Sequence, residues 1–256
     1  MADIERYVHV YVVGGAGDGT SWADAYDNII TMLAAEETDL VTATSTFRCQ
    51  FRSSGNSADN AAGPILIDGW TTNASYFPTF ELGETKISPK TWDTDVYRIS
   101  QTAGRVDISN DYVVWDSLQI ETTYRRCLYC TSDEVMVKNC VMRADTAYAA
   151  GMLNFTGAGT TCYAKNNILF GHGANSFYGG ILVDNGIAYI HNNSVVDMTG
   201  IGIWVSLDGT CYISNNVVFD CTDNYYDGGG GFSGNNNAYS EGVDGKSLFK
   251  IIIFIS

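Results

Sequence analysis

The sequence predicts an all-β fold, a single-stranded right-handed parallel β-helix, for most of its 256 residues. The first observation is a strand-turn-strand pattern that occurs six times from Asp111 to Tyr239, with Ser or Asn at one corner. The corner positions are Ser117, Asn139, Asn166, Asn192, Asn215 and Asn236, which recur every 21 to 27 residues. A period of this size is typical of a solenoid, in which each unit buries its apolar faces on its neighbours.

The second observation is that apolar residues hold the same places relative to each corner. A stacked strand must keep every second side chain inside. The positions four before, two before and three after the corner are apolar in nearly every unit, for example Val135, Val137 and Met142. We expect these columns to form the core of the solenoid.

The third observation is a column of amides one position after the corner. Its members are Leu118, Cys140, Asn167, Asn193, Asn216 and Asn237. Alternation turns this position inward, where stacked amides can bond to one another and to the turn backbone, so that no polar group is buried alone. The sequence therefore predicts an internal asparagine ladder.

The first 38 residues are predicted to form a strand and a capping helix. Residues 7–13 alternate as YVHVYVV and precede a glycine-rich turn. Ser21 is the predicted helix N-cap, with Asp24 three residues later and apolar residues at helical spacing from Trp22 to Ala34. Such a helix would cover the open end of a β stack.

The rest of the chain divides into a β-helix at 39–240 and an apolar segment at 241–256. The repeat is blurred before residue 111, although TFRCQF and PILIDGW are strand-like. Between the later units, GMLNF, GGILV and GIWV predict a third strand per rung and hence a three-sided coil. The ending KSLFKIIIFIS is a final strand, a tail buried by a partner, or the end of a truncated chain.

Composition excludes several classes of function. A formal charge of −15 and a pI near 4.3 argue against nucleic acid or an anionic membrane as a partner. No stretch reaches the roughly 18 apolar residues of a membrane span, and the start lacks the features of a secretory signal. Seven cysteines are an odd number, and the Cys127/Cys130 pair has no second pair beside it, so we expect reduced packing residues.

The repeated units and the helix-capped start resemble the right-handed parallel β-helix superfamily, which includes pectate lyases, polygalacturonases and phage tailspikes. The resemblance covers roughly residues 39–240 and implies the fold, but one fold hosts many functions. The stretch from DGWTT through KTWDTDVYRI to DYVVWDSLQIE looks like β-helix proteins of phage and metagenomic origin. This second resemblance implies a place on a virion surface or another extracellular assembly.

One candidate binding surface is the outward column three residues before the corner. This column reads Val114, Met136, Tyr163, Tyr189, Tyr212 and Ser233, and the column beside it reads Asp116, Lys138, Lys165, His191, Ser214 and Asn235. An aromatic strip flanked by hydrogen-bond donors suits a sugar chain or a protein partner. The competing interpretation is that aromatic residues simply stack well on a sheet.

A candidate catalytic group lies at the bend after the second strand. Asp145, His172, Asp197 and Asp220 fall within one column of each other across four rungs. Paired carboxylates can cleave a glycosidic bond by acid and base or nucleophilic catalysis. The segment around His172, Gly-His-Gly, resembles that of polygalacturonases, but that family's paired aspartates and Arg-Ile-Lys motif are missing. Asp and Gly at turns also need no catalytic reason.

A lyase would instead need calcium-binding acids facing a base such as Arg125, Arg126, Arg143 or Lys165, and no motif selects any of these. We expect no cofactor, and calcium is the one ion that a carboxylate-rich surface would collect. The leading hypothesis is a noncatalytic structural protein that forms a homo-oligomer, with a trimer favoured, or binds other virion subunits. The alternative is a polysaccharide hydrolase or lyase.

Overall fold

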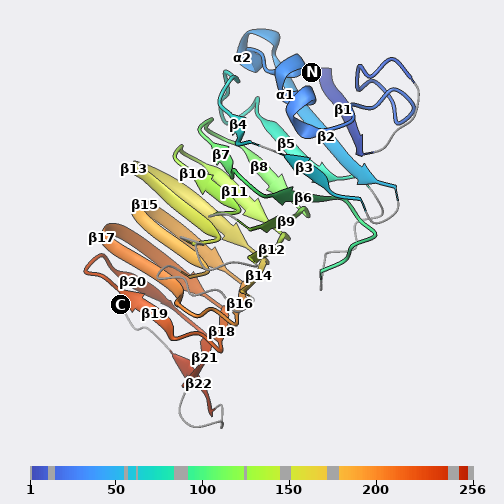
Figure 1. Cartoon of the computed structure of the whole chain (residues 1–256). Coiled ribbons are helices and arrows are strands. Elements are labelled where there is room, and N and C mark those ends of the chain that lie inside the picture. The colour runs from blue at the N-terminus through green and yellow to red at the C-terminus, as the bar shows by residue number, and fades with distance from the viewer. Residues whose placement is uncertain are drawn as a thin grey trace.

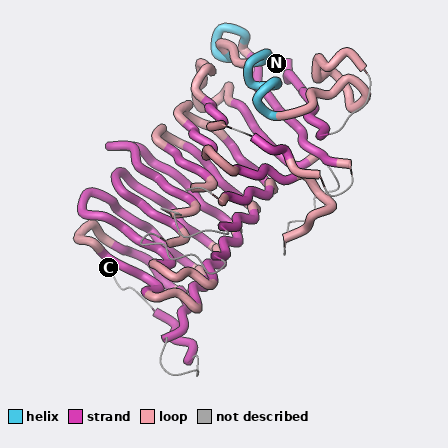
Figure 2. The backbone as a smooth tube through the Cα atoms, in the orientation of Figure 1, coloured by secondary structure: helices cyan, strands magenta, loops and turns pink. Residues whose placement is uncertain are grey.

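The chain forms a parallel β-helix, as the computed structural model in Figure 1 shows. The structure describes residues 2–10, 15–54, 57–61, 63–83, 92–123, 126–144, 151–171, 179–241 and 248–252. Within these residues, nearly all the regular structure is strand, and the helices are confined to the N-terminal end (Figure 2). Strands from successive rungs pair in parallel, in the order of the sequence, as a solenoid requires.

Each complete rung has three sides, which we number in chain order. The first side holds β1 (Ala2–Val10), β2 (Ser45–Ser53), β5 (Pro78–Leu82), β8 (Val114–Asp116), β11 (Val135–Lys138) and β20 (Phe232–Asn235). The second side holds β3 (Asp59–Ala61), β6 (Arg98–Gln101), β9 (Gln119–Thr122), β12 (Val141–Ala144), β14 (Ile168–Gly171), β16 (Ser194–Val196), β18 (Val217–Phe219) and β21 (Asn237–Glu241). The third side holds β4 (Ile65–Ile67), β7 (Val106–Ile108), β10 (Leu128–Cys130) and β19 (Asp223–Asp227).

Three long strands run through two sides. They are β13 (Leu153–Lys165), β15 (Ile181–His191) and β17 (Ile201–Ser214). The first part of each continues the third side, and its last part continues the first side of the next rung. These two sides therefore belong to one 13-stranded sheet, whereas the second side is a separate 9-stranded sheet. The predicted third strand per rung is confirmed, but it is continuous with the strand that follows.

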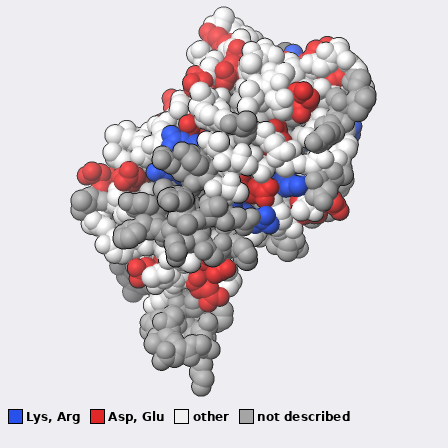
Figure 3. All heavy atoms as spheres, in the orientation of Figure 1, with Lys and Arg blue, Asp and Glu red and all other residues white. Residues whose placement is uncertain are grey.

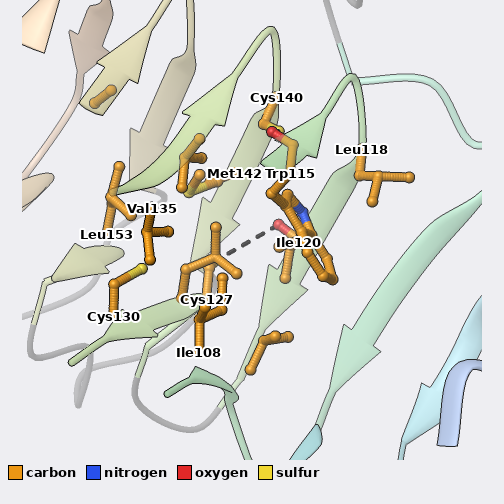
Figure 4. Packing of buried hydrophobic residues seen from close by; sticks show 14 of the residues in the cluster. Ile108, Trp115, Leu118, Ile120, Cys127, Cys130, Val135, Cys140, Met142 and Leu153 are labelled. Carbon is orange, nitrogen blue, oxygen red and sulfur yellow. Dashed lines mark hydrogen bonds between the residues drawn. The ribbon is translucent and has the colours of Figure 1, made fainter. Parts of the chain in front are cut away.

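The apolar columns are the core, as predicted. Val135, Val137 and Met142 are fully buried, and the equivalent residues of the neighbouring rungs pack on them. Figure 4 shows Trp115, Cys127 and other labelled side chains filling the space between the sides. At the last rung, Tyr225 and Phe232 are only partly buried against this core.

The corner residues adopt left-handed backbone conformations. Ser117 has φ 60°, Asn139 has φ 56°, and the four later corner asparagines fall between 55° and 58°. Asn visits this region more readily than most residues because its short polar side chain bonds locally. The tight turn between the first and second sides thus explains why asparagine recurs at the corner.

The asparagine ladder is confirmed one position later. The side-chain oxygen of Asn193 accepts bonds from the backbone N–H (2.9 Å) and the side-chain amide (3.0 Å) of Asn167. Asn216 accepts the same two bonds from Asn193, and Asn237 accepts them from Asn216. All four amides are at most 1% exposed. The ladder satisfies buried polar groups and holds the rungs in register.

The start of the N-terminal helix was predicted wrongly. Helix α1 spans Ile29–Glu36 and has Asn28, not Ser21, as its N-cap. Ser21 instead bonds to the carboxylate of Asp24, and Tyr26 pairs with β1 through the N–H of His9 and the carbonyl of Tyr7. A turn at residues 21–24 and the bridge of Tyr26 to β1 take the place of a helix here, so tertiary contacts override the helical spacing.

The two ends of the solenoid are closed differently. Helix α1 packs against β4 and buries Ile29, Met32 and Leu33, and the short helix α2 (Leu40–Ala43) follows it. At the other end, β22 (Leu248–Ile252) pairs antiparallel with β21. A final strand is therefore what this part of the C-terminal segment forms.

The cysteines have no disulfide partners. All seven are free, and only Cys221 is more than slightly exposed. The thiol of Cys127 contacts the carbonyl of Ile120 (Figure 4) and also that of Arg143. Burial raises the pKa of the Cys140 thiol to about 12. Cys127 and Cys130 are packing residues of the core, as predicted.

Candidate functional site

Three tyrosines lie side by side on the outer face of the first side. In β13, Cys162 and Ala164 point inward, so Tyr163 between them points outward. Strand register places Tyr163 opposite Tyr189, and Tyr189 opposite Tyr212. The predicted column is thus confirmed as a neighbouring set, and the parallel register of the core is what aligns it.

The rings of these tyrosines are stacked. The ring centroids of Tyr163 and Tyr189 are 5.4 Å apart and those of Tyr189 and Tyr212 are 4.9 Å apart, with 14° between planes in both pairs. Tyr212 is 38% exposed and the other two are partly exposed. Three parallel rings with polar tips therefore form a ridge that follows the axis of the solenoid.

The hydroxyl of Tyr163 points toward a carboxylate. Its oxygen lies 3.5 Å from the Oε1 atom of Glu134, which occupies a left-handed turn before β11. Partial burial and the charge of Glu134 raise the pKa of Tyr163, so this hydroxyl stays a neutral donor at ordinary pH.

Polar and basic residues flank the ridge in the neighbouring outward column. Lys138 forms an ion pair with Asp116 at 3.3 Å. The ammonium group of Lys165 lies 5.2 Å from the ring centroid of Tyr163, within the range of a cation–π contact. We call Tyr163, Tyr189 and Tyr212, with Lys138, Lys165 and His191, the tyrosine strip.

His191 is held by the rung that follows it. Its Nδ1 atom and the hydroxyl of Ser214 are 2.6 Å apart, and its ring lies 6.2 Å from that of Tyr189. Burial first, and the charge of Lys165 second, lower the pKa of His191 below its ordinary value. The ring is therefore neutral at pH 7 and can accept the Ser214 proton at Nδ1.

The candidate catalytic residues are only partly brought together. Asp197 and Asp220 follow paired strands on consecutive rungs, at φ 57° and 54°, and both are exposed. Asp145 and His172 lie outside the described residues. The second-side strand of each rung separates these carboxylates from the tyrosine strip, so the two candidates are distinct places on the molecule.

The candidate lyase bases are engaged elsewhere. Arg143 bonds to Glu121 at 3.0 Å and lies 4.7 Å from the ring centroid of Trp92. Arg126 lies over Tyr129, and Arg125 is outside the described residues. Arg143 and Arg126 therefore lie on the second and third sides, and neither shares a site with Lys165 on the first side.

Sequence reasoning missed two arrangements. On the third side, the ring of Tyr129 lies 4.0 Å from the guanidinium of Arg105 and 4.7 Å from that of Arg126. Near the N-terminus, the Nε2 atom of His9 lies 2.6 Å from the hydroxyl of Ser54. Each joins residues from different rungs, so no local spacing could have revealed it.

The His9–Ser54 pair does not fit a nucleophilic serine. A guanidinium nitrogen of Arg52 lies 3.5 Å from Nδ1 of His9 and can only donate a proton there. Nε2 then carries the ring proton and donates it to Ser54. A general base would need the opposite tautomer.

Among the residues that the structure describes, no three His, Cys, Asp or Glu side chains gather to hold a metal ion. The described helices are also too short or too polar to cross a membrane.

Comparison of the chain with protein-family models, with curated proteins and with solved structures finds no significant match.

Proposed function

We propose that this chain is a noncatalytic structural β-helix of a virion or other extracellular assembly that contacts glycans through the tyrosine strip. The observation that carries the proposal is the stack of three outward tyrosine rings, 4.9 to 5.4 Å apart. Flat aromatic area with polar tips suits the apolar faces and hydroxyl edges of sugar rings.

The rest of the molecule is consistent with such a role. The solenoid is rigid because each rung is fixed to its neighbours by parallel strands and by the asparagine ladder. Asp and Glu are spread over the face drawn in Figure 3, which favours solubility. The resemblance to phage tailspike-like β-helices is the reason for proposing a virion surface, with a trimer or other virion subunits as partners.

The glycan contact is tested by binding to immobilised neutral and acidic polysaccharides. Tyr189→Ala removes the middle ring, and we expect it to weaken binding about tenfold, because stacked aromatic contacts of this kind are worth roughly 1 kcal/mol or more each. Tyr226→Ala is the matched control, since Tyr226 is 44% exposed on the third side, away from the strip. Equal binding by both variants and the unchanged protein would contradict the proposal.

A second candidate function is polysaccharide cleavage at Asp197 and Asp220. The observation that favours it is their position on consecutive rungs, which are about 4.8 Å apart in a sheet. Carboxyl groups about 5 Å apart suit a retaining glycosidase. Following new reducing ends and unsaturated products tests this candidate. Turnover that is lost in both Asp197→Asn and Asp220→Asn would establish it over the noncatalytic proposal.

A further inference from the structure

Lys165 is an unusual cation in this acidic molecule. The chain carries 29 acidic and 14 basic residues, and six of its described basic side chains form ion pairs. Within the described part of the chain, the ammonium group of Lys165 forms no ion pair, and it lies over the ring of Tyr163. A cation surrounded by excess acid would normally be paired, so its isolation requires an explanation.

The two outward strand columns around it also lack carboxylates, and Glu134, in the turn before β11, is an acid that borders the strip, 3.5 Å from the Tyr163 hydroxyl. From β11 to β20, strand register places the outward residues in two columns. The columns are Met136, Tyr163, Tyr189, Tyr212 and Ser233, and Lys138, Lys165, His191, Ser214 and Asn235. Neither contains Asp or Glu. On the preceding rungs the same columns do contain acids, but Glu81 pairs with Arg48 and Asp116 pairs with Lys138.

His191 adds a second group that can become positive. It follows Lys165 in the same column, and its Nδ1 is occupied by Ser214, so Nε2 is the atom available to a ligand. The charged or titratable groups that face it are Lys165 from the preceding rung and Tyr189 and Tyr212 from the ridge. No carboxylate among the described residues takes part in these contacts.

We infer that the tyrosine strip takes an acidic glycan, with Lys165 binding its negative group and His191 strengthening that binding once protonated. This inference rests on the proposed function, because the rings must bind sugar for the charge to matter. An ammonium group is a compact donor for a carboxylate or sulfate. An ionised ligand group would supply the partner that Lys165 lacks within the chain.

Single-stranded nucleic acid is the other ligand that stacks on aromatic residues beside cations. The formal charge of −15 disfavours it, because each added phosphate is repelled by the rest of the molecule. An acidic glycan can place one carboxylate at Lys165 while its neighbouring sugar rings stack on the tyrosines, and it needs no phosphate on every unit. We therefore argue for the glycan and use the nucleic acid as a competing probe.

The experiment compares two forms of one polymer. Alginate carries a carboxylate on every sugar, and carboxyl-reduced alginate has the same backbone without charge. We expect the full-length protein to bind alginate at least about tenfold more tightly than the reduced form, as a charge-assisted hydrogen bond allows. Lys165→Met should abolish this difference, whereas Lys165→Arg should retain it, since Arg keeps the positive charge that Met lacks.

The pH dependence tests His191. Between about pH 7.5 and about pH 5.5 the alginate carboxylates stay ionised, since an ordinary carboxyl pKa is near 4. A bound carboxylate favours the charged ring, so binding of alginate should tighten as the pH falls in the unchanged protein and stay constant in His191→Gln. A tightening that persists in His191→Gln would overturn the role of this residue.

The outcomes separate this inference from the proposal beneath it. Equal binding of both polymers, lost in Tyr189→Ala, would overturn the charge preference and keep the glycan contact. Binding of neither polymer would overturn both. Tighter binding of a thymidine oligonucleotide than of alginate would replace the glycan with nucleic acid.

Discussion

At the scale of single residues, two neighbouring asparagines have different structural roles. Asn192 is exposed at a corner, where its left-handed backbone conformation (φ 58°) forms the turn. Asn193 is 1% exposed, and its amide joins the rungs before and after it. Asparagine therefore permits the left-handed turn at one position and forms the buried hydrogen bonds between rungs at the next.

Replacing Asn193 with Ala should be strongly destabilising. The N–H and the amide of Asn167 would lose their acceptor, and the carbonyl of Ala164 would lose a donor at 2.9 Å. Buried polar groups left unpaired cost about 1–3 kcal/mol each, so we expect a loss of about 3 kcal/mol or more in urea unfolding.

Asn192→Gly is the matched control for that measurement. Glycine adopts positive φ without strain, so the stability should change by less than about 1 kcal/mol. Similar losses in the two variants would contradict the division between corner and ladder.

At the scale of elements, the N-terminal cap is joined to the solenoid by one buried carboxyl. Asp59 in β3 accepts hydrogen bonds from the N–H of Ile29 at 2.9 Å and from the hydroxyl of Tyr97 at 2.8 Å. Asp59 thereby joins the first turn of α1 to the second side of the β-helix. Burial raises the pKa of Asp59 despite these bonds, and the nearby charge of Asp27 acts in the same direction.

The raised pKa of Asp59 predicts the sign of a pH effect. The folded state holds the proton of Asp59 more tightly than the unfolded state does. The stabilisation of the fold by this proton is therefore complete below the unfolded pKa and is lost as the pH rises through the folded pKa. We expect Asp59→Asn, which keeps an acceptor oxygen, to gain stability relative to the unchanged protein between pH 4 and pH 7.

The measurement is urea unfolding of both proteins across that pH range. Comparing the pair isolates Asp59 from the other acids, because these are common to both chains. A constant difference in the free energy of unfolding from pH 4 to pH 7 would show that the carboxyl does not titrate differently in the folded state.

At the scale of the whole molecule, we propose that the chain associates through strand edges at its C-terminal end. The described strands β19 and β20 each pair on one edge only, with β17, whereas β21 is covered by β22. Exposed strand edges invite pairing with another chain. The proposed homo-oligomer, with a trimer favoured, would remove this hazard.

Truncation before Leu248 tests the role of the apolar segment. Deletion uncovers the edge of β21, so we expect altered assembly or lower solubility, measured by light scattering coupled to size-exclusion chromatography. A stable monomer both before and after truncation would contradict the proposed oligomer. Residues 253–255 of this segment lie outside the described residues.

The sequence by itself determined the period, the inward columns, the ladder and the outward alignment of Tyr163, Tyr189 and Tyr212. These follow from strand alternation and a regular repeat, so that the position in one unit predicts the neighbours in the next. The resemblance to the β-helix superfamily implies the fold but selects no enzymatic activity, because one fold hosts many functions.

Only the tertiary structure decided where the helix starts, how the third and first sides join, and which polar groups meet. Ser21 has helix-capping chemistry, yet it begins a turn that leads to the bridge between Tyr26 and β1. The bond between His191 and Ser214 joins two consecutive rungs. Local pattern cannot reveal such pairings, because they arise between residues far apart in the sequence that stacking brings into contact.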